Sequence, residues 1–437
     1  MSRRSVLGTV GRVAPWQSVS RAGAGLLPIL IAGWFGRSAA TDLYSLFAAV
    51  FTMAGALIFS CFKDSALVPV LMALERRQPD AVPRLVGAVA GYALVAASAL
   101  AVLIGTAVVL WARASLEPAL LPLAGPMAAG FSVGLLALAL RSLLSALLAV
   151  RFRFVSEAMG VAIGAAVTVG LAAVTHRRGG VAALPWALAA GELVAAAFLA
   201  LAARRAGVRA RLGWTRTPEL RRLARLVAAE IGGAAVVRVN PLVDQVMAQA
   251  LGIVGGGTML RLSGDLGHAG TSFVGPVFLS ILLSHLAEAG AARDHRRFHA
   301  ILRRSLVVVG TALGALSILG SVFRAPLVQL VYGRGAMDAA ALARMAELLP
   351  YHLAGMGPLG VAMILARAHV SLGNSRILIQ MGTLNALSNL ALNFLLVRPL
   401  GLAGIALSTS IVSGVVAVVF WIRLQGIAPA ALQESRA

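Results

Sequence analysis

The chain is built from successive apolar segments, each long enough to cross a lipid bilayer as a helix. A transmembrane helix needs about 20 mainly apolar residues, because backbone N–H and C=O groups in hydrocarbon must be satisfied within the segment. We place twelve such segments near residues 17–36, 44–73, 85–111, 121–149, 155–174, 182–203, 224–251, 258–286, 305–323, 347–368, 378–397 and 402–423. The pattern predicts an all-α polytopic membrane protein with these twelve transmembrane helices.

Composition supports this class and excludes several functions. Of the 437 residues, 59% are hydrophobic and 12% are charged, and the mean hydropathy is +0.88. Soluble domains are roughly 45–50% apolar and about 25% charged. The net charge of +22 alone is typical of a nucleic-acid binder, but such binding needs a soluble basic face, and the apolar segments leave none. We therefore assign the charge to loops and expect no nucleic-acid partner.

The reactive residue types carry no pattern that indicates catalysis. Cys61 is the only cysteine, and the seven histidines form no HExxH or other paired-ligand spacing. The sequence also lacks the GxxxxGK[ST] loop of ATP-hydrolysing proteins. We expect a protein that is not an enzyme and that holds no transition metal.

The distribution of arginines predicts both orientation and domain organisation. Arginine-rich loops stay cytoplasmic, and with the N-terminus inside, most loop arginines fall on the cytoplasmic side, as does the C-terminus. The longest basic stretch, Arg204–Arg225, holds eight arginines. It separates a first lobe at 1–203 from a second at 224–437, with a linker at 204–223, a plan common in transporters. The linker is either an amphipathic helix on anionic headgroups or a regulatory site.

Charged residues inside the predicted spans are the first functional candidates, because each costs several kcal/mol unless it faces water or a partner. The cations so placed are Arg21, Lys63, Arg141, Arg238, Arg261 and Arg367. Arg21 and Arg367 lie near span ends, where the alternative is a long side chain that reaches the headgroups. Arg141 has no acid nearby in sequence, which favours a side chain that faces a cavity. Arg261 and Asp265, four residues apart, either bind substrate or form an internal salt bridge.

A cavity lined by arginines suits an anionic substrate. Arginine is permanently charged, and its planar fork can bind two phosphate oxygens at once. The predicted chemistry is therefore recognition of a phosphate-bearing molecule by side chains such as Arg141.

A polar stripe on span 378–397 is the second candidate. Asn385, Ser388, Asn389 and Asn393 follow one another at spacings of three and four, so they share one helix face. Amide oxygens beside a carboxylate, for which we nominate Asp244, match the preferences of a small hard cation. The alternative is ordinary hydrogen bonding between helices.

Three stretches of the sequence resemble a known family. They are SRAGAGLLPILIAGWFGRSAATDLYSLF from Ser20, VYGRGAMDAAALARMAELLPYHLAGM from Val331, and ILARAHVSLGNSRILIQMGTLNALSNLALNFLLVRPLGLAGIALSTS from Ile364. Together they resemble the MurJ/MviN lipid II flippases of the multidrug/oligosaccharidyl-lipid/polysaccharide exporter superfamily.

The resemblance implies two six-helix lobes around a central cationic cavity. It also implies a flippase of the bacterial inner membrane that moves a polyprenyl-diphosphate-linked saccharide by alternating access. The implied partners are this lipid-linked saccharide, membrane lipids and envelope-synthesis enzymes, without a cofactor other than a sodium ion. Two other functions stay open: a cation-coupled exporter of small molecules on the same fold, and a non-transporting scaffold for envelope assembly.

Residue by residue, the resemblance assigns two cavity positions directly. Arg21 matches the cavity arginine of span one, and Asp42 matches the acid of the FGxxxxTD stretch. Other charged positions of the family fall on Leu27, Gly55, Ala56 and Gly264 in this sequence. The cations expected to replace them are Lys63, Arg141, Arg238 and Arg261.

The resemblance also implies the sodium ligands. Asp244, Asn389, Asn393 and Thr409 fall at positions similar to those ligands, and Ile405 falls at a backbone-carbonyl position. Asn393 stands where a second carboxylate occurs in some members, so we expect a less negative site.

Overall fold

The computed structural model describes residues 3–56, 67–78, 81–207, 213–215, 217–225, 227, 239–274, 276–292, 294–374 and 376–433, and all regular structure within these ranges is helical. The helices are α1 (Arg3–Phe35), α2 (Ala39–Gly55), α3 (Val68–Arg77), α4 (Val82–Ser115), α5 (Leu121–Val150), α6 (Phe154–Gly179), η4 (Gly180–Ala183), α7 (Leu184–Arg205), α9 (Asn240–Ala250), α10 (Gly256–His268), η5 (Ala269–Val274), α11 (Pro276–Ala291), α12 (His295–Val322), α13 (Arg324–Tyr332), α14 (Ala339–Leu353), α15 (Met356–Ser371), α16 (Arg376–Leu400) and α17 (Leu402–Gln433). The expected all-α class is confirmed.

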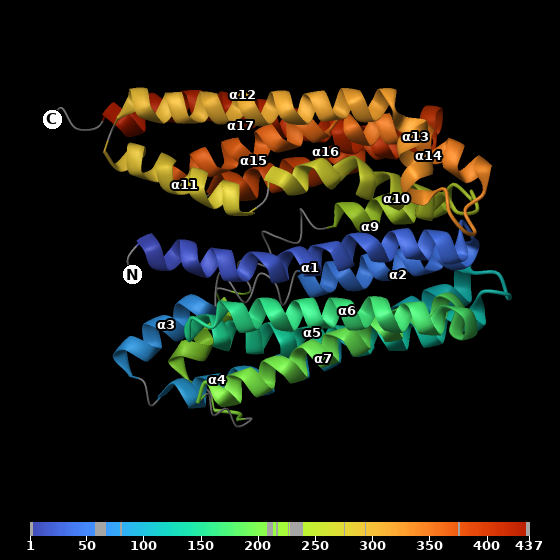
Figure 1. Cartoon of the computed structure of the whole chain (residues 1–437), viewed down its shortest axis with the longest axis horizontal. Coiled ribbons are helices and arrows are strands. Elements are labelled where there is room, and N and C mark those ends of the chain that lie inside the picture. The colour runs from blue at the N-terminus through green and yellow to red at the C-terminus, as the bar shows by residue number, and fades with distance from the viewer. Residues whose placement is uncertain are drawn as a thin grey trace. The chain divides into compact units, whose positions relative to one another are not determined.

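The chain divides into two compact units, which we call the N-terminal lobe (Met1–Arg238) and the C-terminal lobe (Val239–Ala437). Figure 1 shows α1–α7 in blue to green and α9–α17 in yellow-green to red. At the end of the predicted linker, residues 218–225 form a helix that extends two residues beyond it, and Leu223 is buried against Leu67 and Leu71 of the N-terminal lobe. This helix therefore has an apolar side that packs on protein.

The turn between α1 and α2 is built by its own sequence. Gly36, with φ of 59°, ends α1 in the left-handed region that favours glycine. Ser38 then caps α2: its hydroxyl accepts the Thr41 N–H at 3.2 Å, and its own N–H donates to Thr41 Oγ1 at 2.9 Å. This capping box satisfies amide donors that the first helical turn leaves free. It also places Asp42 in that first turn, where a carboxylate interacts favourably with the helix dipole.

The N-terminal lobe packs around α5 through small residues. A side chain added at Gly130 of α5 would approach Pro185 of α7 at 2.8 Å, so the two helices are in close backbone contact there. Beside this contact, Phe51 of α2 stacks on Phe131 of α5 with ring centroids 5.2 Å apart. The small residue at Gly130 thus lets α5 and α7 pack closely, and the stacked aromatic rings fill the space between α5 and α2.

In the C-terminal lobe, α14, α15 and α17 hold the core together. Ser410 of α17 donates to the carbonyl of Tyr351 on α14, and His369 of α15 lies with its Nε2 at 2.9 Å from the carbonyl of Phe420 on α17. On α10, Gly267 leaves room for His352: an added Cβ would lie 2.5 Å from the Cβ of that histidine. The two hydrogen bonds join α14 and α15 to α17, and the close approach at Gly267 brings α10 against α14.

Seven segments of the described residues are long and apolar enough to cross a membrane. They are Gly11–Phe35, Val82–Ser115, Leu121–Val150, Phe154–Arg205, His295–Val322, Ala339–Ser371 and Leu402–Gly426. Phe154–Arg205 contains both α6 and α7, and α2, at 17 residues, is apolar but shorter. The asparagines of α16 lower its mean hydropathy, and it is not among the seven. A multi-pass membrane protein is therefore confirmed, and the number twelve stays a prediction.

Candidate functional site

A polar cluster in the C-terminal lobe joins α9, α16 and α17. Asn393 of α16 donates through its Nδ2 to Asp244 Oδ1 of α9 at 2.7 Å and to Asn389 Oδ1, one turn earlier, at 3.2 Å. Ser408 of α17 donates to the Asn393 carbonyl oxygen, and Asn389 Nδ2 donates to Thr409 Oγ1 of the same helix at 3.3 Å. Four residues nominated from the sequence thus form one connected set.

The remaining nominated residue completes the cluster through its backbone. The Ile405 carbonyl lies 2.8 Å from Ser408 Oγ and 3.4 Å from Thr409 Oγ1. Asn389, Asn393 and Ser408 expose at most 1% of their surface, so these polar groups are removed from solvent. Such burial is tolerable because each group has a partner within the cluster.

The donor set of this cluster fits a small hard cation. It offers one carboxylate, two side-chain amide oxygens, two hydroxyls and a backbone carbonyl, all oxygen ligands of the kind that alkali and alkaline-earth cations prefer. Ser408 was not predicted as a member. A signal for it exists in the sequence, because Ser408 follows Ile405 by three residues and so lies on the same helix face.

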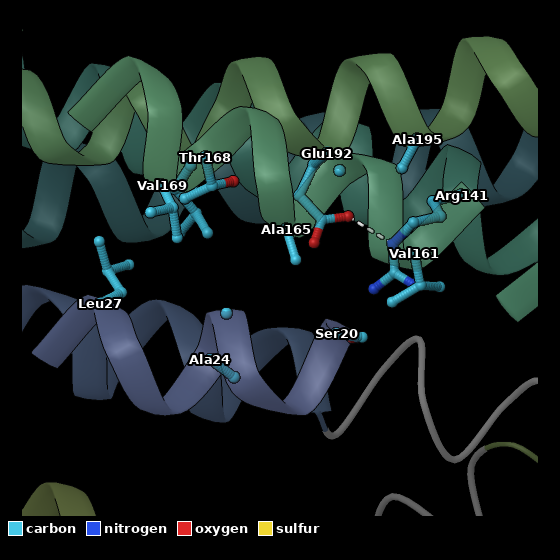
Figure 2. A pocket seen from close by; sticks show the side chains of 13 residues that line it. Ser20, Ala24, Leu27, Arg141, Val161, Ala165, Thr168, Val169, Glu192 and Ala195 are labelled. Atoms are coloured by element: carbon cyan, nitrogen blue, oxygen red, sulfur yellow. Dashed lines mark hydrogen bonds and ion pairs between the residues drawn. The ribbon is translucent and has the colours of Figure 1, made fainter. Parts of the chain in front are cut away.

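A cavity of about 190 Å³ lies within the N-terminal lobe, and the charged residues Arg141 and Glu192 line it. It is lined by Ser20, Gly23, Ala24 and Leu27 of α1, Arg141 of α5, Val161, Gly164, Ala165, Thr168 and Val169 of α6, and Leu188, Glu192 and Ala195 of α7. Arg141 thus lines a cavity, as the sequence favoured. Its Nε donates at 2.5 Å to Oε2 of Glu192, an acid that the sequence pattern does not pair with it (Figure 2).

The other predicted cavity residues have separate surroundings. Arg21 is exposed on α1, one position after Ser20, and does not line this cavity. Asp42 is buried, with 8% of its surface exposed, at the start of α2. Lys63 and Arg238 lie outside the described residues.

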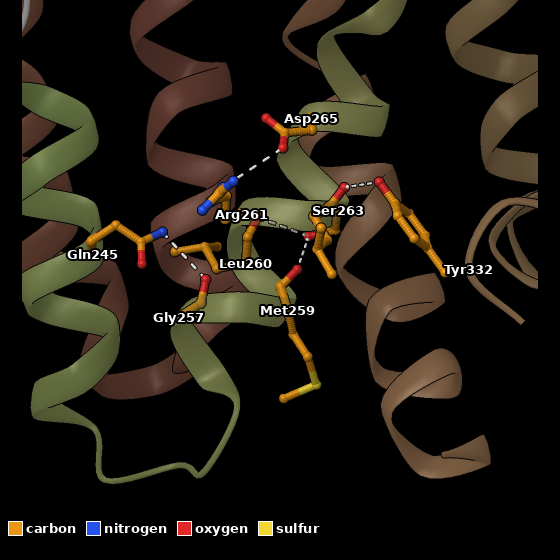
Figure 3. Close-up of polar contacts among 9 residues, drawn as sticks. Gln245, Gly257, Met259, Leu260, Arg261, Ser263, Asp265 and Tyr332 are labelled. Atoms are coloured by element: carbon orange, nitrogen blue, oxygen red, sulfur yellow. Dashed lines mark hydrogen bonds and ion pairs between the residues drawn. The ribbon is translucent and has the colours of Figure 1, made fainter. Parts of the chain in front are cut away.

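Arg261 of α10 lies beside Asp265, as the spacing of four predicts. Its Nε is 3.9 Å from Asp265 Oδ2, and the two side chains are 26% and 50% exposed. Figure 3 shows the pair on one side of α10 and Tyr332 on the other, where the phenol donates to the Leu262 carbonyl at 3.1 Å. The internal salt bridge, one of the two alternatives for Arg261, is therefore present.

The chain is similar to known proteins both in sequence and in fold. The family model described as "Lipid II flippase MurJ" matches residues 31–431. The chain belongs to the MurJ lipid II flippase family. No curated protein matches the sequence at a significant level.

Solved structures of this fold are similar over nearly the full chain. A lipid II flippase MurJ in an inward closed conformation has a TM-score of 0.79 at 14% identity, covering 96% of this chain and 88% of that one. An inward-facing multidrug resistance MATE family transporter has a TM-score of 0.77 at 12% identity, covering 96% of each chain. A transporter of the same superfamily from Pyrococcus furiosus has a TM-score of 0.69 at 12% identity, covering 97% of this chain and 96% of that one. At these identities the similarity concerns the fold, which is that of MurJ and MATE transporters.

Proposed function

We propose that this MurJ-family protein is a flippase that moves a polyprenyl-diphosphate-linked saccharide, lipid II or a related precursor, from the cytoplasmic to the outer leaflet of the bacterial inner membrane. The family match over residues 31–431 is the observation that carries this proposal. Alternating access is the mechanism we infer, because similar structures have been solved in inward-facing and outward-facing conformations. Both termini are proposed to be cytoplasmic, on the arginine distribution.

Arg141 and Arg21 are the residues that we propose to bind the diphosphate in the N-terminal lobe. Arg141 lies in a cavity and is permanently charged, and Arg21 is exposed one position from the cavity-lining Ser20. Asp42, Lys63, Arg238 and Arg261 remain predicted members of the substrate path. No covalent chemistry is needed for this activity, since recognition and movement of the cargo suffice.

We further infer that the polar cluster of Asp244, Asn389, Asn393, Ile405 and Thr409 binds sodium. Its oxygen-only donor set supports this inference, and its single carboxylate suits a monovalent ion. The Asn393 amide donates to Asp244, so ion binding would require the amide to turn and present its oxygen instead. Occupancy of the site would therefore alter contacts between α9, α16 and α17.

An exporter of organic cations on the same fold is the competing function, because MATE transporters share the architecture. The N-terminal cavity argues against it. An organic cation requires an uncompensated acid, whereas the acid in this cavity, Glu192, is paired with Arg141.

The proposal is tested with the purified protein in vesicles that contain fluorescently labelled lipid-linked sugars. Access of a membrane-impermeant quencher then reports the leaflet that each lipid occupies, and lipid II is compared with a precursor that lacks the peptide. We expect protein-dependent movement of at least one precursor. Arg141→Gln is expected to slow it by about tenfold or more, since hydrogen bonds to charged groups contribute ~1.5–3 kcal/mol.

The matched control is Arg344→Gln, which removes an arginine from an exposed pair with Glu347. It should leave the rate unchanged. Absence of movement for both precursors, with the protein inserted and folded, would contradict the proposed function.

A further inference from the structure

Within the described part of the chain, Arg141 makes one polar side-chain contact. Its Nε donates to Glu192, and among the described residues no other hydrogen-bond partner contacts its guanidinium. As far as the described residues go, the N–H donors of its two terminal amino groups are therefore available to an anion. Figure 2 shows both side chains extending from α5 and α7 into the space beside α1.

We propose that Glu192 is a built-in counter-ion that competes with the diphosphate for Arg141 and so sets how readily the cargo is released. This inference rests on the proposed function, and it assigns a role to a residue outside the diphosphate-binding set. Glu192 acts through Arg141 and is a positioning residue.

The helices that carry the pair are closely packed, so their backbones have little freedom to separate it. On α5 and α7, Gly134 lies opposite Ala189 at ordinary contact distance. On α6 and α7, an added Cβ at Gly164 would lie 2.7 Å from the Gly191 carbonyl, directly before Glu192. A bound anion must therefore compete through the side chains of Arg141 and Glu192.

The cavity has a volume of about 190 Å³ and little competing charge. Arg141 and Glu192 are the charged residues that line it, and the hydroxyls of Ser20 and Thr168 are its other polar side chains. Arg21 lies next to Ser20 on α1 but not on the lining. An anion that enters thus meets one positive group and one negative group.

The two charges have opposite effects on the empty and the loaded states. In the empty lobe, Glu192 compensates a guanidinium that would be costly to leave unpaired at membrane depth. When an anion approaches the terminal amino groups, the same carboxylate repels it and weakens its hold on Arg141. A purely structural salt bridge does not need terminal amino groups without a partner among the described residues, whereas binding and release of an anion at Arg141 require them.

Glu192→Gln separates these two effects. The glutamine carbonyl can still accept the hydrogen bond from Arg141 Nε, but the negative charge is gone. The probe is inorganic pyrophosphate, titrated calorimetrically into the full-length protein in nanodiscs. We expect E192Q to bind it about tenfold more tightly than the wild type, within the 5- to 150-fold range of typical site coupling. R141Q should lose binding.

Transport provides a readout that a structural role would not move. With a labelled lipid-linked precursor in vesicles, E192Q is expected to lower both KM and kcat, because the cargo binds more tightly and leaves more slowly. The matched control is Glu347→Gln in the exposed Arg344–Glu347 pair, which should change neither value.

Several outcomes would overturn the inference while leaving the proposed function intact. One is an unchanged pyrophosphate affinity in E192Q while the wild type flips its precursor, and another is no pyrophosphate binding by that flipping wild type. If E192Q does not fold, the double variant R141Q/E192Q decides, since transport at the wild-type rate would mean that the pair is only structural. A different outcome is that no preparation moves either precursor although E192Q binds pyrophosphate more tightly than the wild type. That result would contradict the proposed function but support an anion site at Arg141 and Glu192.

Discussion

Asn393 on α16 donates a hydrogen bond of 2.7 Å to the carboxylate of Asp244 on α9, which lies 149 residues earlier in the chain. Asn393 is fully buried, and its carbonyl oxygen accepts from Ser408 on α17. One amide thus links three helices of the C-terminal lobe. Any ligand that recruits the Asn393 oxygen must rearrange this link, which connects ion binding to helix packing.

Asn393→Asp should strengthen sodium binding. The substitution places a second carboxylate among the same oxygen donors, and the affinity of such sites rises with ligand charge, here on the order of tenfold. The measurement is the sodium concentration that gives half-maximal thermal stabilisation of the purified protein, with potassium as the reference salt. A half-maximal concentration equal to or above that of the wild type would contradict the sodium assignment.

Asp244→Asn should remove sodium-dependent stabilisation. A ligand that binds only the folded state adds RT ln(1 + [L]/Kd) to stability, so loss of the charged ligand removes the dependence of Tm on sodium. Asp265→Asn, which removes the half-exposed carboxylate beside Arg261 in the same lobe, is the matched control and should keep it. Equal sodium responses in the two variants would place the ion elsewhere.

Ser408→Ala should destabilise the C-terminal lobe although it removes only one hydroxyl. Ser408 is fully buried and lies within hydrogen-bond distance of both the Asn393 carbonyl oxygen and the Ile405 carbonyl. Leaving a buried acceptor unsatisfied costs about 1–3 kcal/mol. A lower melting temperature in detergent is the expected result, with Ser371→Ala, whose half-buried hydroxyl bonds to its own helix, as the control.

The polar cluster and the cavity at Arg141 differ in how far the sequence could predict them. Spacings of three and four placed the asparagines of α16 on one face, because helical periodicity is a local property. The sequence shows Arg141 as a lone charge in an apolar span, but its partner Glu192 is 51 residues away on another helix. A contact between two helices depends on which helices pack together, and the residues next to Arg141 in the sequence do not indicate this. A usable signal was present all the same, since Glu192 is the only acid in the predicted span 182–203.

The helix boundaries show the same division between local and long-range information. Apolar length predicted long helices such as α4 and α5, but the single segment predicted at 258–286 corresponds to α10, the short helix η5 and α11. The capping residues around Ser38 mark where α2 begins. The paired helices α6 and α7, by contrast, meet through Gly164 and Gly191, whose role depends on what lies opposite. A glycine in the sequence does not by itself indicate which residue of another helix packs against it.

Gly164→Ala should therefore be strongly destabilising, whereas Gly170→Ala on the same helix should not. An added Cβ at Gly164 would lie 2.7 Å from the Gly191 carbonyl oxygen and 2.9 Å from the Ala195 Cβ, so α6 and α7 would have to move apart. Overpacking of this kind costs about 1–3 kcal/mol. At Gly170 nothing lies within 4 Å of an added Cβ, and alanine should instead stabilise the helix by up to about 1 kcal/mol.

Thermal unfolding of the two glycine variants in the same detergent measures the difference. The Gly164→Ala protein is expected to melt below the wild type and the Gly170→Ala protein at or above it. Because the crossing at Gly164 also positions Glu192, the Gly164→Ala variant should in addition alter pyrophosphate binding, while Gly170→Ala leaves it unchanged. Equal melting temperatures for the two variants would mean that α6 and α7 are not packed through Gly164, and the fixed geometry of the Arg141–Glu192 pair would lose its structural basis.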